Sequence, residues 1–290
     1  MLHRIGRTAF VLVQYVLPQH WLSSLMYRLA RTRNRRFTER MIRAFARIYD
    51  VNLAEAVHSD PGAYGCFNEF FTRELKADAR PLPDAPLVPV SPADGAISQI
   101  GPIDGDRLIQ AKGVSYTLDA LLADPDAAGR YRGGSFVTIY LSPRDYHRLH
   151  MPVSGVLREM RYVPGKLFSV NEATASAVPG LFARNERVIA QFDTDCGPMA
   201  LILVGAIFVG GIETVWHGEV CPSPGPRQVQ TWRYGEAGLK LERGAEMGRF
   251  NLGSTIIVLF GPAAVTWDAG LAPAQPVRLG QALGQLVRNA

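Results

Sequence analysis

Three short segments carry residues whose types and spacing could do chemistry. They are residues 91–95 (SPADG), 142–152 (SPRDYHRLHMP) and 248–255 (GRFNLGST). They supply a carboxylate in a tight turn, two histidines three residues apart, and a serine that follows a glycine. An acid that orients a base, and a base that takes a hydroxyl proton, are what an activated serine requires. The segments therefore predict chemistry at the serine.

The third segment fits an attack of the chain on itself. Ser254 follows Gly253 and begins an apolar run, completed by TIIVLF, that is typical of a buried strand. The Ser254 hydroxyl would have to reach the carbonyl of Gly253, and glycine there removes the Cβ that would crowd the attack. A small residue before serine at a strand entrance is also common in ordinary turns, so a structural interpretation stays open.

The sequence lacks the motifs that several other kinds of catalysis require. The chain has no GxSxG, HExxH or Walker sequence. None of its four lysines has a setting that suggests a pyridoxal site. The three cysteines form no CxxC pair, which favours a reducing compartment, and no second ligand cluster accompanies the two histidines. We therefore expect no metal site.

The first 50 residues are strongly basic. They hold ten arginines against Glu39 and Asp50, which gives about +8 (10 − 2), whereas the whole chain is +5. Such a segment favours an anionic partner, either nucleic acid or an anionic lipid surface. The apolar run at 9–17 stops at Pro18, short of the roughly 20 residues that span a bilayer. A signal peptide is disfavoured because no small-residue cleavage site follows.

Two further stretches have apolar residues on one helical face, with arginines opposite. They are Trp21, Leu22, Leu25, Met26 and Leu29, and then Met41, Ile42, Phe45, Ile48 and Tyr49. Basic amphipathic helices with Trp and Phe commonly lie in the membrane interface. The alternative is that these apolar faces pack on the rest of the protein. The aromatic segment 67–75 (FNEFFTREL) leaves a similar choice between lining an acyl entrance and packing under the helices.

The pattern of residues along the sequence changes after a proline-rich connection at 78–92. Beyond it, short β-rich runs alternate with Gly and Pro, at Ser135–Leu141, Val188–Thr194, Met199–Val209, Gln228–Tyr234 and Thr255–Phe260. The predicted class is α+β, with N-terminal amphipathic helices before a β-rich sandwich or barrel. The expected division is a membrane-associating helical segment at 1–77, the connection, and a catalytic domain at 93–290.

PADG, YHRLHMP and LGST before an apolar strand together resemble the phosphatidylserine decarboxylase family of bacteria and mitochondria. Further similar stretches are QAKG (110–113), YVPGKLFSVN (162–171), FARNER (182–187), GAIFVGGIETVW (205–216) and GQALG (280–284), besides FNEFFTREL. The resemblance covers most of the chain from about residue 60. Its length and the position of LGST are similar to the compact bacterial membrane form.

The resemblance implies that the chain cuts itself between Gly253 and Ser254. Ser254 would attack the Gly253 carbonyl with His150 as general base, and Asp94 would orient the imidazole. Elimination and hydrolysis would then leave a pyruvoyl group at Ser254. The products would be a β chain, 1–253, and an α chain, 254–290. The choice of His150 over its neighbouring histidine rests on the order of the family's motifs.

The resemblance also implies the second reaction. The amine of phosphatidylserine would form a Schiff base with the pyruvoyl group, the only cofactor required. The ketone would accept the electrons released with CO₂, and His147 would donate the proton that gives phosphatidylethanolamine. No metal is implied.

The implied partners are phosphatidylserine and an anionic phospholipid surface, with the α and β chains held together. A peripheral protein on the cytoplasmic side of a bacterial inner membrane is expected, with no nucleic acid, because basic and aromatic residues do not interleave on the β-rich part. A homodimer is one option for the assembly. Two rivals stay open: a pyruvoyl-dependent decarboxylase of a soluble amino acid, and a membrane adaptor in which LGST is only a turn.

Overall fold

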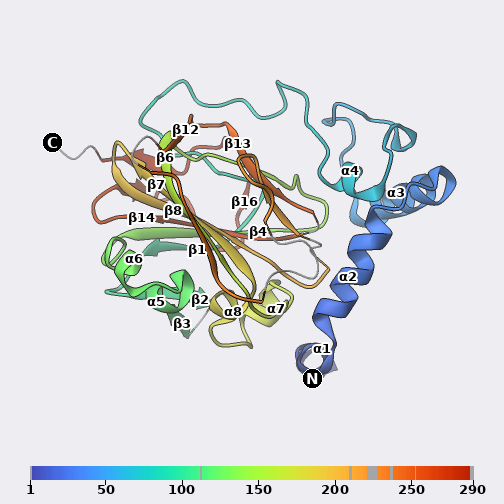
Figure 1. The fold of residues 1–290 in the computed structure, drawn as a ribbon, viewed down its shortest axis with the longest axis horizontal. Coiled ribbons are helices and arrows are strands. Elements are labelled where there is room, and N and C mark those ends of the chain that lie inside the picture. Colours follow the sequence, from blue (N-terminus) through green and yellow to red (C-terminus); the bar gives the residue numbers. More distant parts are fainter. Residues whose placement is uncertain are drawn as a thin grey trace.

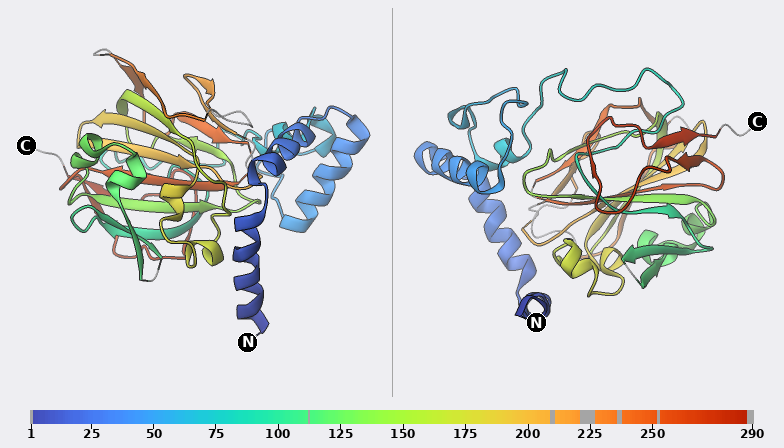
Figure 2. Two further views of the ribbon diagram at one scale, coloured as in Figure 1. Left: turned by 60° about the horizontal axis from the view of Figure 1, so that its bottom comes forward. Right: turned by 180° about the vertical axis from the view of Figure 1, so that it is seen from behind.

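The computed structural model describes residues 2–111, 113–208, 211–220, 227–235, 238–251 and 253–287, with side chains from residue 9 onward. The N-terminal helices lie along one side of a β-rich body, and the C-terminus lies at its opposite end (Figures 1 and 2). This arrangement confirms the predicted α+β class. Lys112, Val209, Cys221 and Leu252, which belong to sequence features discussed above, lie outside the described residues, as do the side chains of Arg4 and Arg7.

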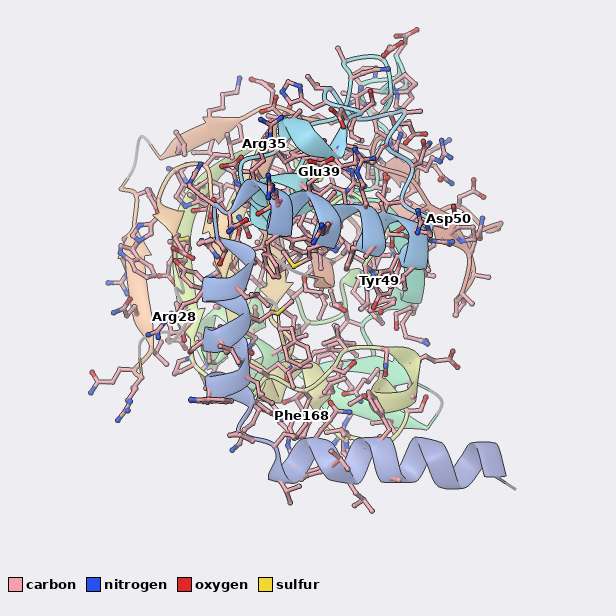
Figure 3. The ribbon with its side chains drawn as sticks, turned by 90° about the vertical axis from the view of Figure 1, so that its right-hand side faces the viewer. Arg28, Arg35, Glu39, Tyr49, Asp50 and Phe168 are labelled. Carbon is pink, nitrogen blue, oxygen red and sulfur yellow. The ribbon has the colours of Figure 1, made fainter. Side chains whose placement is uncertain are left out.

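Three helices lie on one side of the β-rich body. They are α1 (Leu2–Val16), α2 (Gln19–Ala30) and α3 (Arg35–Tyr49). In Figure 3, α2 runs between α3 above and α1 below. Pro18 separates the first two helices, and α3 begins after Asn34, whose side chain accepts a hydrogen bond from the Phe37 amide. In the described part of the chain, no helix is both long and apolar enough to cross a membrane.

The polar faces of α1 and α2 dock on the body. The Gln14 side chain accepts a hydrogen bond from the Ser169 amide at 2.7 Å, and Gln19 accepts one from the Leu167 amide at 2.8 Å. Both glutamines are buried, whereas Val16 is 82% exposed and Trp21 64% exposed. Most of the apolar surface of these two helices therefore faces outward, contrary to the alternative of packing on the body.

The third helix behaves differently, because its apolar face packs on the protein. Ile42 is buried, and the Phe45 ring lies 5.0 Å from Phe67 and 6.0 Å from both Phe70 and Phe71, measured between centroids. All three phenylalanines belong to the short helix α4 (Phe67–Phe71). The FNEFF segment thus packs under the helices, and α3 keeps large apolar side chains exposed at its two ends, at Phe37 and at Ile48 and Tyr49.

The body is built on one large antiparallel sheet, nine-stranded within the described residues, in the order β11-β6-β7-β8-β14-β4-β1-β16, with β12 also paired to β6. Its strands are β1 (Gly95–Pro102), β4 (Ser135–Leu141), β6 (Gly155–Val163), β7 (Arg187–Thr194), β8 (Gly197–Val204), β11 (Gln230–Arg233), β12 (Leu239–Leu241), β14 (Ser254–Phe260) and β16 (Pro276–Val277). Every residue of β14 is buried, and the strand pairs with β4 on one side and β8 on the other. The last predicted run is therefore an interior strand.

A second sheet and several small elements cover the first. The sheet has the order β10-β9-β13-β5 in the described chain, and its strands β5 and β13 contribute to the same hydrophobic core as β14. The bounds are β5 (Arg148–His150), β9 (Ile212–Thr214), β10 (Gly218–Glu219) and β13 (Glu246–Phe250). Smaller elements include η1 (Pro61–Ala63), α5 (Leu118–Leu122), α6 (Pro125–Gly129), α7 (Glu172–Ala175), α8 (Leu181–Arg184), and the strand pairs β2 (Arg107–Ala111) with β3 (Val114–Thr117) and β15 (Val265–Trp267) with β17 (Gly284–Leu286).

The strand predictions hold with one correction. The runs at 135–141, 188–194, 228–234 and 255–260 each correspond to a strand. The run predicted to extend from 199 to 209 ends instead at Val204. Gly205 carries no side chain to pack, and Phe208 has a positive φ of 68°, which is incompatible with a continuing strand.

Candidate active site

The Gly253–Ser254 bond lies at the edge of the core. Ser254 is the first residue of β14, opposite Leu141 of β4, and it is fully buried. Its hydroxyl oxygen has no hydrogen-bond partner among the described residues. A buried hydroxyl left unpaired costs about 1–3 kcal/mol, so such a group calls for a functional explanation.

His147 is the side chain that the structure brings to this bond. A Cβ placed on Gly253 would lie 3.8 Å from His147 Nε2. The ring is held by a 2.9 Å hydrogen bond from Nδ1–H to the Asp145 carbonyl, which leaves a lone pair on Nε2. Like the serine hydroxyl, this Nε2 is buried and has no partner among the described residues. The ring also packs on Phe71, with centroids 4.1 Å apart.

The surroundings keep His147 neutral. Complete burial lowers the pKa of His147 to about 3, and the positive charge of Arg73 adds to the effect, while the hydrogen bond to the Asp145 carbonyl opposes it. At neutral pH the imidazole is thus a free base with its acceptor atom toward Gly253.

His150 comes three residues after His147 and is the last residue of β5. Its Nδ1–H donates to the Gly244 carbonyl at 2.8 Å, and its Nε2 lies 3.5 Å from the Tyr146 hydroxyl. Burial lowers the pKa of His150, and the Gly244 carbonyl opposes the shift. No atom of His150 is within 4 Å of the Cβ position of Gly253. The described geometry therefore does not join His150 directly to the scissile bond.

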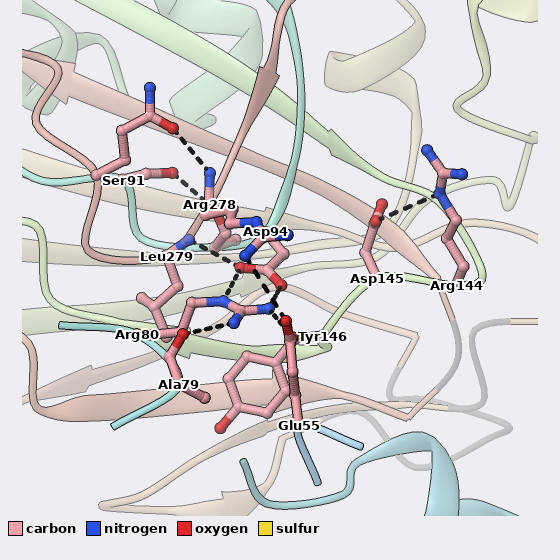
Figure 4. Close-up of polar contacts among 12 residues, drawn as sticks. Glu55, Ala79, Arg80, Ser91, Asp94, Arg144, Asp145, Tyr146, Arg278 and Leu279 are labelled. Carbon is pink, nitrogen blue, oxygen red and sulfur yellow. Dashed lines mark hydrogen bonds and ion pairs between the residues drawn. The ribbon is translucent and has the colours of Figure 1, made fainter. Parts of the chain in front are cut away.

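The Asp94 carboxylate is held by an arginine. Arg80 donates to both of its oxygens, from Nε at 2.8 Å and from Nη2 at 2.6 Å, and the Leu279 amide donates a third hydrogen bond at 2.8 Å (Figure 4). Arg80 Nη2 also donates to the Glu55 carboxylate at 2.7 Å. The hydrogen bonds that Arg80 donates, above all those to Asp94, raise the pKa of Arg80.

The turn at 91–95 and the His150 strand are nevertheless neighbours. The His150 amide donates to the Pro92 carbonyl at 2.9 Å, and the charge of Asp94 acts on the imidazole by raising its pKa. Their side chains are not hydrogen-bonded to each other: His150 donates to the Gly244 carbonyl, and Asp94 accepts from Arg80. The structure thus gathers all the predicted site residues at one end of β4 and β14, with His147 nearest to the bond.

Sequence reasoning missed the residues that position this site. Arg80 lies in the proline-rich connection, where nothing in the pattern indicates a structural role. Asn251, two residues before Gly253, is buried and donates to Glu213 at 3.3 Å, and Arg249 binds the same carboxylate at 2.9 Å. Glu213 lies in the segment 205–216, which was noted above only as a stretch that resembles the family.

A pocket of about 570 Å³ opens beside these residues. It is lined by Arg73, Asp94, Tyr140, Ser142, Arg144 and Tyr146, among others. Leu141, which pairs with Ser254, lies between the lining residues Tyr140 and Ser142, but neither Ser254 nor His147 is part of the lining. Within the described ranges, no group of three or more His, Cys, Asp or Glu side chains could hold a metal ion.

Comparisons with known proteins show which family the chain resembles. A family model described as phosphatidylserine decarboxylase matches residues 67–285, and a second one, described as PSD, matches residues 9–50. The chain is 55% identical over 280 residues to a phosphatidylserine decarboxylase proenzyme of Azotobacter vinelandii, covering 95% of this chain and 97% of that protein. Proteins of the same name from Methylococcus capsulatus (55%, covering 95% and 96%) and Bordetella pertussis (56%, covering 94% and 93%) are similar.

The family model covers about three quarters of the chain and contains all three chemical segments. The relatives match it over nearly their whole length at more than half identity. The resemblance noted in the sequence is thereby confirmed, and the chain belongs to the phosphatidylserine decarboxylase family.

Proposed function

We propose that this chain is a proenzyme that cuts itself before Ser254 and then decarboxylates phosphatidylserine to phosphatidylethanolamine. The observation that carries the proposal is the pair of buried, unpartnered atoms at one peptide bond, Ser254 Oγ and His147 Nε2. A nucleophilic hydroxyl and a basic nitrogen that lack hydrogen bonds in a core lower the stability of the fold. Such groups are characteristic of sites where they take part in a reaction. The names of the relatives fit this function.

In the first reaction, Ser254 Oγ attacks the Gly253 carbonyl carbon. The proton leaves through an imidazole, which we assign to His150 with Asp94 as its supporting acid. The amide nitrogen leaves, and Gly253 becomes an ester of the serine oxygen. Elimination across Cα–Cβ of Ser254 releases a Gly253 carboxylate and forms dehydroalanine. Hydrolysis of its imine tautomer releases ammonia and leaves the pyruvoyl group.

The residues present fit a pyruvoyl group at Ser254, because its oxygen has no hydrogen-bond partner among the described residues and glycine leaves the preceding position open. Once formed, the group supplies an electron sink through Schiff-base chemistry with the substrate amine. We assign to His147 the proton that replaces CO₂. Phe71 covers its ring and limits the access of water to that proton.

The membrane is the proposed site of action. Large apolar side chains of α1 and α2 are exposed while polar ones are buried, and arginines flank them. An exposed apolar patch with this charge is suited to the interface of an anionic bilayer. Each basic residue near such a surface contributes about 1 kcal/mol. We infer peripheral binding by the segment 1–77 on the cytoplasmic side of an inner membrane.

The experiment that tests the proposal is denaturing mass spectrometry of freshly produced protein, followed by an assay of CO₂ release from phosphatidylserine. Two chains split after Gly253 are expected. The smaller chain should be lighter, by one ammonia, than plain hydrolysis predicts. An intact chain under every folding condition would overturn the self-cleavage and favour the membrane adaptor. A pyruvoyl chain that releases CO₂ only from soluble amino acids would overturn the substrate.

The exposed apolar residues should govern binding to vesicles. Replacing Leu12, Val16 and Trp21 together with glutamine is expected to weaken co-sedimentation with anionic vesicles at least tenfold, because each burial contributes about 1.5–3 kcal/mol. Raising salt from about 0.1 to 0.5 M should weaken the wild type as well. The matched control is Val287→Gln, which removes an exposed apolar side chain near the C-terminus, at the end of the body opposite α1 and α2. Equal binding of both variants would exclude α1 and α2 as the membrane contact.

A further inference from the structure

Arg73 is a buried cation without an anionic partner. The residue is only 5% exposed, and within the described chain it forms no ion pair within 4 Å. Its Nη2 approaches the carbonyls of Arg144 and Asp145 at 3.3 and 3.5 Å, and its Nε is buried with no hydrogen bond. A charge removed from water at this depth is costly unless something compensates it.

The other arginines of the adjoining pocket are already engaged. Arg80 is bound by two carboxylates, and Arg278 lies 3.6 Å from Glu55. Arg144 is largely exposed and lies 4.0 Å from Asp145. Among the described residues that line the pocket, Arg73 is thus the buried cation left to meet a ligand. Arg73 interacts electrostatically with Asp94 and lowers the pKa of His147, which places it close to the proposed reaction.

We propose that Arg73 binds the phosphodiester of the phospholipid headgroup in this pocket. The inference rests on the function proposed above and names the group that holds its substrate. The volume of about 570 Å³ suits a headgroup of this size, and the pocket adjoins the β4 residue that pairs with Ser254. A guanidinium matches phosphate oxygens in geometry and charge.

The substrate carries two anionic groups, a carboxylate and a phosphate, and the reaction indicates which of them Arg73 binds. The carboxylate loses its charge when it leaves as CO₂, so an arginine bound there would stabilise the ground state more than the transition state. The phosphate keeps its charge throughout, and binding it holds the substrate without opposing the reaction. The phosphate is therefore the partner of Arg73.

Binding there also affects His147. Arg73 is the charged residue that acts on this imidazole, and its positive charge lowers the histidine pKa. A phosphate beside Arg73 would oppose that charge and raise the pKa of His147. The histidine would then hold a proton more readily when substrate is present than in the uncut chain.

The test compares Arg73→Gln, Arg73→Lys and the control Arg107→Gln, which changes an exposed arginine of β2 outside the pocket, each as the full chain. Mass spectrometry first checks that they are cut. With short-chain phosphatidylserine, Arg73→Gln is expected to raise KM about tenfold or more with kcat within a few-fold, as for loss of a charge-assisted hydrogen bond. Arg73→Lys should be intermediate, and Arg107→Gln should resemble wild type.

Short-chain phosphatidylethanolamine separates the two anions, since it keeps the phosphate and lacks the carboxylate. Its inhibition constant should weaken by the same factor as KM. An unchanged inhibition constant with a raised KM would assign Arg73 to the carboxylate, and an unchanged KM would remove it from binding altogether. If both Arg73 variants stay uncut, the residue is structural and the inference fails. A wild type that never cuts would instead refute the proposed function.

Discussion

Replacing Ser254 with alanine is expected to leave one chain of 290 residues with no measurable decarboxylase activity. The variant lacks the oxygen that attacks Gly253 and the atoms from which the pyruvoyl ketone would form. It should fold, because the lost hydroxyl has no hydrogen bond among the described residues. Removing such a group relieves about 1–3 kcal/mol of desolvation cost. Denaturing mass spectrometry and an assay with phosphatidylserine vesicles measure both effects.

The next residue provides a matched control. Thr255 is also fully buried in β14, and its hydroxyl likewise has no partner. Thr255→Val removes an unpaired hydroxyl from the same strand and should still be cut to completion. Cleavage of Ser254→Ala at the same bond would show that another group attacks, and would refute the assignment of Ser254.

The two histidines should separate the two reactions. With the roles proposed above, His150→Ala is expected to slow self-cleavage by about 100-fold to 10,000-fold, the usual contribution of a general base. His147→Ala should be cut but should lose about 100-fold or more in turnover, because it lacks the proton donor. Time-resolved gels measure the first effect, and kcat of the cut enzyme measures the second.

The opposite pattern would have a clear structural meaning. His147 Nε2 lies near Gly253 in the uncut chain, and His150 does not. If His147→Ala stays whole while His150→Ala is cut, the closer histidine is the base. Such a result would overturn the order of roles that the family motifs imply.

The low pKa of His147 adds a measurement of stability. The folded pKa of about 3 lies below the ordinary value of 6.5, so the unfolded chain binds more protons between these values. The free energy of unfolding of Ser254→Ala should therefore decrease as pH falls from about 6.5 toward 3. Adding His147→Gln should make the urea midpoint less sensitive to pH in this window. His150, whose pKa is also lowered, accounts for part of the remaining slope.

The elements that the sequence predicted best are those with one dominant pattern. The apolar run before Gly261 was predicted to be a buried strand, and β14 is buried throughout. The run that ends in GAIFVGG was overextended, because local apolarity does not show where a neighbouring strand stops: β14 leaves no partner for β8 beyond Val204. The N-terminal helices were predicted, but the sequence could not decide which apolar face is covered, and α3 differs from α2 in this respect.

The candidate site was predictable as a set of residues and not as a geometry. Short motifs indicated Asp94, His147, His150 and Ser254, because each carries a reactive group in a distinctive segment. Their partners come from distant parts of the chain. Arg80 reaches Asp94 from a segment without regular structure, and Leu279 contributes only a backbone amide. Contacts of this kind leave no periodicity or spacing in the sequence.

The interior position of β14 determines what self-cleavage does to folding. Before the cut, β4, β8 and β14 are parts of one molecule, and the strand can join its neighbours as the chain folds. After the proposed cut, the same strand would belong to a separate peptide, and its insertion between two strands would become a reaction of second order. A denatured mature enzyme would then regain its sheet only as fast as two dilute pieces meet, in competition with aggregation. The lifetime of the active form would therefore be set by its unfolding barrier, whereas the precursor would refold as a single molecule.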